Sequence, residues 1–272
     1  MFYRPATLAE ALELKSRLGQ DGVFLSGGTD LVVGVAKGRL EVGHWIDLSR
    51  LAELVYVAPE GDGLCIGASC THAMLEASPY RGLAQAARLV GGPQIRNRGT
   101  VAGNLGTASP AGDVGVSLLA FDAEVELLSL RGGRRVPLRE FFLSPGKTVM
   151  APDELIVAVR LPRAEASGFL KVGKRLSVAI SVVCCGVAKL ADGRFGIALG
   201  SVAPTPLRAA RAEAHLAEHG LNPASIAAAA DLVSEEVRPI DDHRASADYR
   251  RAVSGVIARR LLTEIAGLPD SL

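Results

Sequence analysis

The chain has 272 residues, enough for one large or two medium-sized domains whose core needs no disulfide bonds. Its 30 Lys and Arg residues nearly balance its 29 Asp and Glu residues, so the net charge of +1 excludes a strongly basic nucleic-acid-binding arm and an acidic tail. Aromatic residues make up only 4% of the chain, which argues against a base-stacking surface.

The first part of the chain predicts alternating helices and strands. Thr7 and Glu10 have the spacing of a capping box before a helix that Gly19 ends. The segment 100–113 is rich in glycine, and we expect it to be an extended loop. The other predicted elements are strands at 23–25, 45–48, 54–57, 64–66 and 154–161, helices at 71–77, 82–90 and 114–120, and a hairpin of 123–130 with 134–138.

The last part of the chain follows a different pattern. Its predicted elements are three antiparallel strands at 169–174, 179–190 and 194–201, then three helices at 207–218, 223–236 and 244–266. The change of pattern predicts a boundary near residues 162–168.

The cysteines and the hydropathy pattern restrict where this chain can work. None of its four cysteines forms a CxxC pair or lies at a zinc-finger interval from a histidine, so we expect buried free thiols in a reducing cytosol and no metal site. The N-terminus has no apolar signal core, and the longest apolar run is far shorter than the ~20 residues of a membrane-spanning helix. We expect a soluble, cytoplasmic protein.

Two glycine-rich segments are the strongest feature of the sequence. In the first, the predicted strand 23–25 runs into Ser26-Gly27-Gly28-Thr29-Asp30, and such a turn exposes backbone N–H groups that bind phosphate. Gly-Gly-Thr-Asp is also typical of an ordinary turn, and it matches neither a P-loop nor the G-x-G-x-x-G fingerprint.

The second glycine-rich segment, residues 100–113, combines small hydroxyl side chains with Asn104 and Asp113. Hydroxyl and amide groups satisfy phosphate oxygens, and a carboxylate accepts hydrogen bonds from ribose hydroxyls. The alternative without a binding function is a solvated loop stabilised by Asx and Ser/Thr turns.

Taken together, the two segments resemble the flavoprotein (medium) subunits of molybdenum hydroxylases, which include carbon monoxide dehydrogenase and xanthine dehydrogenase. The family pattern Ala-Gly-Gly-Thr-Asp-Leu is matched at 26–31, and its longer pattern Ile-Arg-Asn-x-x-Thr-Ile-Gly-Gly-Asn-x-x-x-Ala-Ser-Pro-x-Gly-Asp is matched at 95–113. The likeness extends over nearly the whole chain. Ala102 departs from it, because the family has glycine there.

The resemblance implies an α+β fold with a cofactor between its parts. Residues 1–165 would form an FAD-binding domain of the vanillyl-alcohol-oxidase (PCMH) type, with subdomains at about 1–55 and 56–165. Residues 166–272 would form a C-terminal domain of the CO-dehydrogenase-flavoprotein type, with a three-stranded antiparallel sheet and a three-helix bundle.

The resemblance also implies fifteen FAD-binding positions. Main-chain donors to the diphosphate would come from the first segment, and from Thr100, Gly103 and Asn104 on the other side. Leu155 and Ile156 would line the flavin, with Lys171 near its ring. The full set is Ser26, Gly27, Gly28, Thr29, Asp30, Leu31, Ile95, Thr100, Gly103, Asn104, Thr107, Asp113, Leu155, Ile156 and Lys171.

By this likeness the chain is the FAD-carrying, electron-transferring subunit of a larger oxidoreductase. Electrons would come from a molybdenum cofactor on a large partner through [2Fe-2S] clusters on a small partner, and would pass to NAD⁺, a quinone or oxygen. The assembly would be a heterohexamer with two copies of each subunit. We assign no catalytic residue, because a flavin carries the redox chemistry itself.

Two other functions stay open at this point. One is a stand-alone FAD-dependent reductase of the enolpyruvyl-glucosamine reductase type, and the other is a non-enzymic scaffold that has lost its flavin. His215 and His219 have the i, i+4 spacing of a metal pair, but the run His-Leu-Ala-Glu-His lacks the H-E-x-x-H pattern and favours a solvated helix face.

Overall fold

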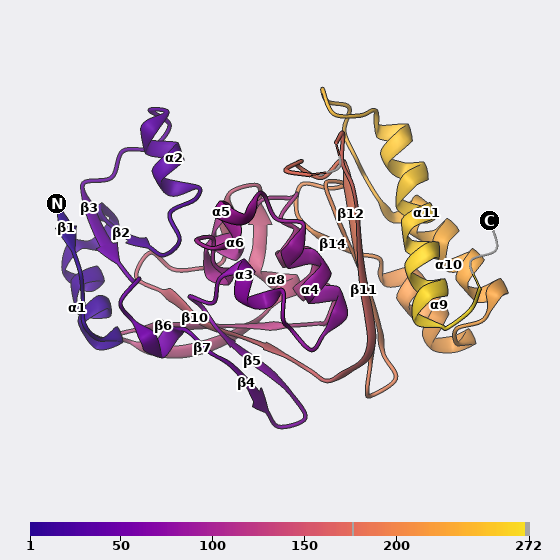
Figure 1. Cartoon of the computed structure of the whole chain (residues 1–272), viewed down its shortest axis with the longest axis horizontal. Helices are drawn as coiled ribbons and strands as arrows, with labels where there is room; N and C mark the ends of the chain where they lie inside the picture. The colour runs from indigo at the N-terminus through magenta and orange to yellow at the C-terminus, as the bar shows by residue number, and fades with distance from the viewer. Residues whose placement is uncertain (176, 270–272) are drawn as a thin grey trace.

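The structure is a computed structural model that describes residues 1–175 and 177–269. It consists of an N-terminal lobe, a central sheet covered by helices, and a C-terminal sheet flanked by a helical bundle, which follow one another along the long axis of the molecule (Figure 1).

The N-terminal lobe is built on a small parallel sheet with the strand order β1-β3-β2. As predicted, Thr7 caps helix α1 by accepting a hydrogen bond from the N–H of Glu10, and Gly19 ends the helix with a φ of +56°. The reciprocal half of the predicted capping box is not formed, because Glu10 Oε2 accepts from the Ala6 N–H and not from that of Thr7. The elements of this lobe are β1 (Phe2–Tyr3), α1 (Leu8–Leu18), the 3₁₀ helix Gly19–Asp21, β2 (Gly22–Leu25), α2 (Leu31–Ala36) and β3 (His44–Asp47).

The central part is an antiparallel sheet with the order β4-β5-β10-β6-β7, and helices pack on this sheet around a single hydrophobic core. Leu155 and Val157 of β10 belong to the core of the N-terminal lobe instead, so this strand joins the two parts. The strands are β4 (Val57–Glu60), β5 (Gly63–Gly67), β6 (Glu124–Ser129), β7 (Gly132–Pro137) and β10 (Leu155–Leu161), with a separate hairpin of β8 (Phe142–Ser144) and β9 (Lys147–Thr148).

The helices of the central part occupy the segments between these strands. They are the 3₁₀ helix Ala52–Leu54 and α3 (His72–Leu75), α4 (Arg81–Arg88), α5 (Pro93–Arg96), α6 (Val101–Thr107), α7 (Asp113–Ala120) and α8 (Leu138–Phe141).

Two predictions for this part are corrected by the structure. The strand predicted at 54–57 is shifted along the chain, because a 3₁₀ helix occupies Ala52–Leu54 and β4 begins only at Val57. The segment 100–113 is not one extended loop, since α6 occupies its first half. Thr100 caps that helix, and Val101 and Leu105 bury one face of it, which outweighs the low helix propensity of Gly103.

The C-terminal sheet lies between two helical layers. Strands β11 (Ala164–Val172), β12 (Val183–Leu190) and β13 (Phe195–Gly200) confirm the three predicted strands, and β14 (Leu207–Arg208) adds a short fourth one at the edge. The prediction of a three-stranded sheet is therefore one strand short. Pairing of β14 with β13 also delays the first C-terminal helix, which begins at Ala210.

The two faces of this sheet serve different cores. Cys184 belongs to the central core, whereas its neighbour Cys185 belongs to the core under the helical bundle, as alternation along a strand requires. A Cβ on Gly196 would lie 1.8 Å from the carbonyl oxygen of Ala120, so glycine lets α7 lie directly on the sheet. The bundle helices are α9 (Ala210–His219), α10 (Pro223–Glu236) and α11 (Ala247–Ile265).

Candidate functional site

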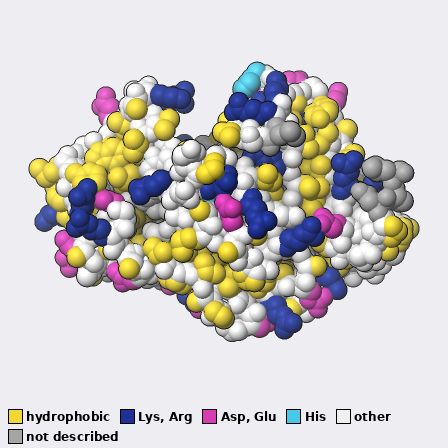
Figure 2. Space-filling view, in the orientation of Figure 1, with side chains coloured by type: hydrophobic (Ala, Val, Ile, Leu, Met, Phe, Trp, Pro, Cys, Tyr) yellow, Lys and Arg dark blue, Asp and Glu magenta, His cyan; other side chains and the backbone are white. Residues whose placement is uncertain are grey.

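A cavity of about 810 Å³ lies between the N-terminal lobe and the rest of the molecule. The space-filling view shows the surface indented between these parts (Figure 2). All fifteen predicted cofactor-binding residues contribute to its wall, although they come from segments up to 145 positions apart, from Ser26 to Lys171. The tertiary structure thus brings the whole predicted set together at one place.

The first glycine-rich turn connects β2 to α2 at the edge of the cavity. Gly28 has a φ of +76°, a conformation that favours glycine. Within the described residues, the backbone N–H groups of residues 27 to 31 donate no hydrogen bond to another part of the chain. A run of unpaired main-chain donors of this kind forms an anion-binding concavity.

The second segment forms the adjoining wall, but it uses most of its own amides. The N–H of Gly103 donates to Thr100 Oγ1 at 3.1 Å, and the N–H of Asn104 donates to the Thr100 carbonyl at 3.0 Å. The main-chain donation expected from Gly103 and Asn104 is therefore directed into α6 in this structure. Asn104 Oδ1 accepts from the Gly115 N–H at 3.0 Å and so holds α6 to α7.

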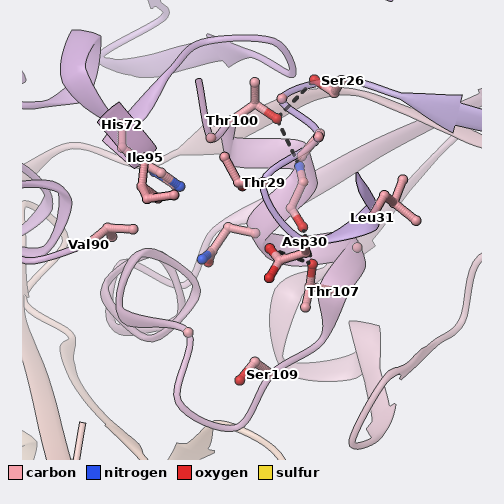
Figure 3. Close-up of a pocket in the computed structure, with 18 of the residues that line it drawn as sticks. Ser26, Thr29, Asp30, Leu31, His72, Val90, Ile95, Thr100, Thr107 and Ser109 are labelled. Carbon is pink, nitrogen blue, oxygen red and sulfur yellow. Dashed lines mark hydrogen bonds between the residues drawn. The ribbon is translucent and has the colours of Figure 1, made fainter. Parts of the chain in front are cut away.

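Hydroxyl contacts join the two segments directly where their walls meet. Ser26 Oγ and Thr100 Oγ1 are 2.9 Å apart, and Thr107 Oγ1 lies 3.4 Å from Asp30 Oδ2 (Figure 3). The backbones also approach closely, because a Cβ on Gly27 would lie 2.2 Å from the carbonyl oxygen of Arg98. The turn is thus held against the central part at several points.

A buried ion pair lies deeper in the site. Lys171 Nζ contacts Asp113 Oδ2 at 2.5 Å, and Ser181 Oγ donates to Asp113 Oδ1 at 2.6 Å. Burial raises the pKa of the Asp113 carboxyl, while Lys171 and Ser181 act in the opposite direction. Both carboxylate oxygens already have partners within the protein. The first role of Asp113, at the start of α7, is therefore to hold the side chain of Lys171 on β11 in place.

The apolar part of the wall has both buried and exposed members. Leu155 and Ile156 are 5% and 3% exposed and also belong to the protein cores, whereas Ile95 is 39% exposed. Ile95 lies beside Val90 on the side of the cavity across from Leu31 (Figure 3). This arrangement offers an apolar surface for a flat ring system next to polar turns.

Sequence reasoning missed His72 in this site. His72 lines the cavity but is only 3% exposed, and Thr71 caps the short helix that begins with it. Burial, with a further contribution from Arg96, lowers the pKa of His72 to about 4, so the imidazole is neutral near pH 7. Its position one residue after a helix-capping threonine was visible in the sequence, but its proximity to the glycine turns was not.

The remaining candidate metal ligands do not assemble. Among residues 1–175 and 177–269, no group of three His, Cys, Asp or Glu side chains is placed to hold a metal ion. His215 and His219 stack with ring centroids 4.3 Å apart, and His219 Nδ1 lies 3.0 Å from the His215 carbonyl oxygen. No helix within residues 1–175 and 177–269 is both long and apolar enough to span a membrane.

Comparison with known proteins identifies the two halves of the chain. Residues 1–164 match the family described as the FAD binding domain in molybdopterin dehydrogenase, and residues 168–265 match the CO dehydrogenase flavoprotein C-terminal domain. The Escherichia coli (strain K12) protein named putative xanthine dehydrogenase FAD-binding subunit is 32% identical, covering 97% of this chain and 94% of its own length.

Further relatives agree over the same length. The nicotinate dehydrogenase FAD-subunit of Eubacterium barkeri is 34% identical over 97% of this chain and 95% of its own. The carbon monoxide dehydrogenase structure from Hydrogenophaga pseudoflava contains a chain that superposes with a TM-score of 0.91 at 33% identity, covering 98% of this chain and 96% of that one. The chain therefore belongs to the FAD-binding (medium) subunits of the molybdenum hydroxylase family, and it is an oxidoreductase subunit with an FAD-binding domain.

Proposed function

We propose that FAD lies in the cavity between the N-terminal lobe and the central part, with its diphosphate on the turn 26–31. The observation that carries this proposal is the run of unpaired backbone N–H groups at residues 27 to 31. Those donors need no basic side chain to bind two adjacent phosphates. The cavity volume of about 810 Å³ is within the range of about 300–1,000 Å³ that is common for small-molecule sites.

The other predicted residues complete the proposed site. Thr100 and Thr107 would offer hydroxyl groups from the second wall, and Asn104 has its side-chain Nδ2 left to donate. Ile95, Leu155 and Ile156 would supply apolar contact, and the remaining members are those of the full set: Ser26, Gly27, Gly28, Thr29, Asp30, Leu31, Gly103, Asp113 and Lys171.

The bound flavin would supply reversible acceptance and release of electrons. The residues of this chain bind it, orient it and limit the access of water. Lys171 is held by Asp113 and donates to the Leu89 carbonyl at 3.1 Å, so its ammonium group is fixed at the cavity wall as one half of a buried ion pair.

We further propose that partner subunits carry the rest of the electron path. A large subunit would hold the molybdenum cofactor and a small one the [2Fe-2S] clusters, in a cytoplasmic heterohexamer with two copies of each. NAD⁺, a quinone or oxygen would accept the electrons.

We propose the domain limits 1–165 and 166–272, with the first domain divided at about residue 55. The change from the central sheet to the C-terminal sheet lies close to this limit, between β10, which ends at Leu161, and β11, whose first two residues from Ala164 fall before it.

The test is whether the purified full chain binds FAD with one-to-one stoichiometry. We expect the absorbance bands of bound oxidised flavin and a molecular mass for the extracted cofactor equal to that of FAD. A chain that stays colourless at saturating FAD would contradict the proposal and favour a scaffold without flavin. Isolation of the native assembly would then show whether molybdenum and iron–sulfur subunits accompany the chain or whether it works alone as a reductase.

A further inference from the structure

His72 has an unusual position in the cavity wall, next to Ile95 (Figure 3). The residue is only 3% exposed, and its Nδ1 atom is buried without any hydrogen-bond partner. Within the described residues, Nε2 also makes no hydrogen bond. Buried polar side chains nearly always have a partner, so an unpartnered imidazole in a cavity wall requires an explanation.

The ring lies next to the glycine-rich turn. The His72 N–H donates to the Gly99 carbonyl at 2.9 Å, and a Cβ on Gly99 would lie 3.2 Å from His72 Nε2. On its other side, the Cα of Gly99 would be 2.9 Å from a Cβ on Gly27. Gly99 therefore contacts both His72 and Gly27, which places the imidazole one residue away from the turn that carries the unpaired amides.

The surroundings of the two ring nitrogens select one tautomer. A proton on Nδ1 would leave a buried donor with no acceptor, which is among the most costly polar arrangements in a protein. A proton on Nε2 instead gives a donor on the side of the ring that meets Gly99 and the cavity. The charged group nearby, Arg96, is paired with Glu76 at 2.7 Å and does not approach His72 as a hydrogen-bond partner.

We propose that the Nε2–H of His72 donates a hydrogen bond to a phosphate oxygen of the bound dinucleotide. His72 would thus extend the main-chain anion site of residues 27 to 31 with one neutral side-chain donor. This inference rests on the proposed function, since it assumes that the diphosphate occupies that end of the cavity. A neutral donor adds a directed contact there without a second buried positive charge to desolvate.

The test compares His72→Phe, which keeps a flat ring but has no donor, with His72→Gln, which keeps an N–H at the reach of Nε2. Each full-length variant is titrated with FAD, and separately with ADP and adenosine as competitors. We expect His72→Phe to weaken FAD and ADP about 10- to 100-fold and adenosine much less, because a hydrogen bond to a charged group is lost. His72→Gln should stay within a few fold of the wild type.

The outcomes separate this inference from the proposed function. If the wild-type chain binds no FAD, the proposed function itself fails. If the wild type binds FAD and His72→Phe binds it equally well, only the role of His72 is overturned. Equal weakening of FAD by the Phe and Gln variants, or equal weakening of ADP and adenosine by the Phe variant, would also overturn it, because ring packing would then explain the effect. Thermal unfolding without FAD shows whether each variant is folded.

Discussion

Gly27 offers the sharpest test of how the N-terminal lobe is joined to the site. In Gly27→Ala, the new methyl group would lie 2.2 Å from the Arg98 carbonyl oxygen and 2.9 Å from the Cα of Gly99. Both are main-chain atoms, so no side chain can rotate away. The turn must move by about 1 Å before these contacts become ordinary van der Waals contacts.

The size of the effect follows from what this movement disturbs. Overpacking of this kind costs about 1–3 kcal/mol of stability. The same movement lengthens the 2.9 Å contact between Ser26 and Thr100 and shifts the unpaired amides away from the second wall. We therefore expect FAD affinity to fall about 10-fold or more, in addition to the lower unfolding temperature.

Trp45 provides the assay, because the only tryptophan of the chain lies on β3 opposite Val23 of β2, in the lobe that carries the turn. Quenching of its fluorescence by FAD gives the dissociation constant, and thermal unfolding gives the stability. Gly43→Ala is the matched control, since Gly43 is in the same lobe and a Cβ there meets no atom within 4 Å. Wild-type affinity and unfolding temperature in Gly27→Ala would refute the close backbone approach and the placement of the diphosphate beside it.

Three further predictions concern charge and protonation. Gly28→Asp should reduce FAD affinity by more than about 100-fold, because it strains the backbone at φ +76° and places a carboxylate beside the phosphates. The control Gly38→Asp, also at positive φ but in open space, should bind FAD normally. Equal losses in the two variants would contradict the assignment of the turn. Lys171→Met should lower the free energy of unfolding by about 3–5 kcal/mol in urea, and adding Asp113→Asn should restore much of it, because the single variant leaves a buried carboxylate unpaired. The pKa of His72 is lowered to about 4 in the folded protein. The neutral imidazole therefore contributes fully to stability above about pH 6.5, where this histidine is also neutral in the unfolded chain, and the contribution is lost as the pH falls toward 4. We expect the free energy of unfolding of the wild type, measured in urea, to be about 2 kcal/mol lower at pH 5 than near pH 7, and we expect His72→Gln to lack this decrease. Identical pH profiles for the two proteins would contradict this expectation.

Local patterns were enough to predict most elements. Thr7 and Gly19 bound α1 as their residue types require, and the predicted hairpin forms between β6 and β7, with Gly132 already paired to Ser129. Local patterns were misleading at α6, where the glycines suggested a loop. The helix forms there because Val101 and Leu105 are fully buried in the central core, which is a tertiary effect.

The sequence by itself determined the family and the two glycine-rich segments, because specific backbone conformations demand particular small residues at fixed spacings. Only the tertiary structure decided how these segments face each other, with Ser26 against Thr100 across 74 positions and Lys171 against Asp113 across 58. It also revealed His72 as part of the same wall. Contacts of this kind depend on how strands pair and helices pack over long separations, and no local periodicity records them.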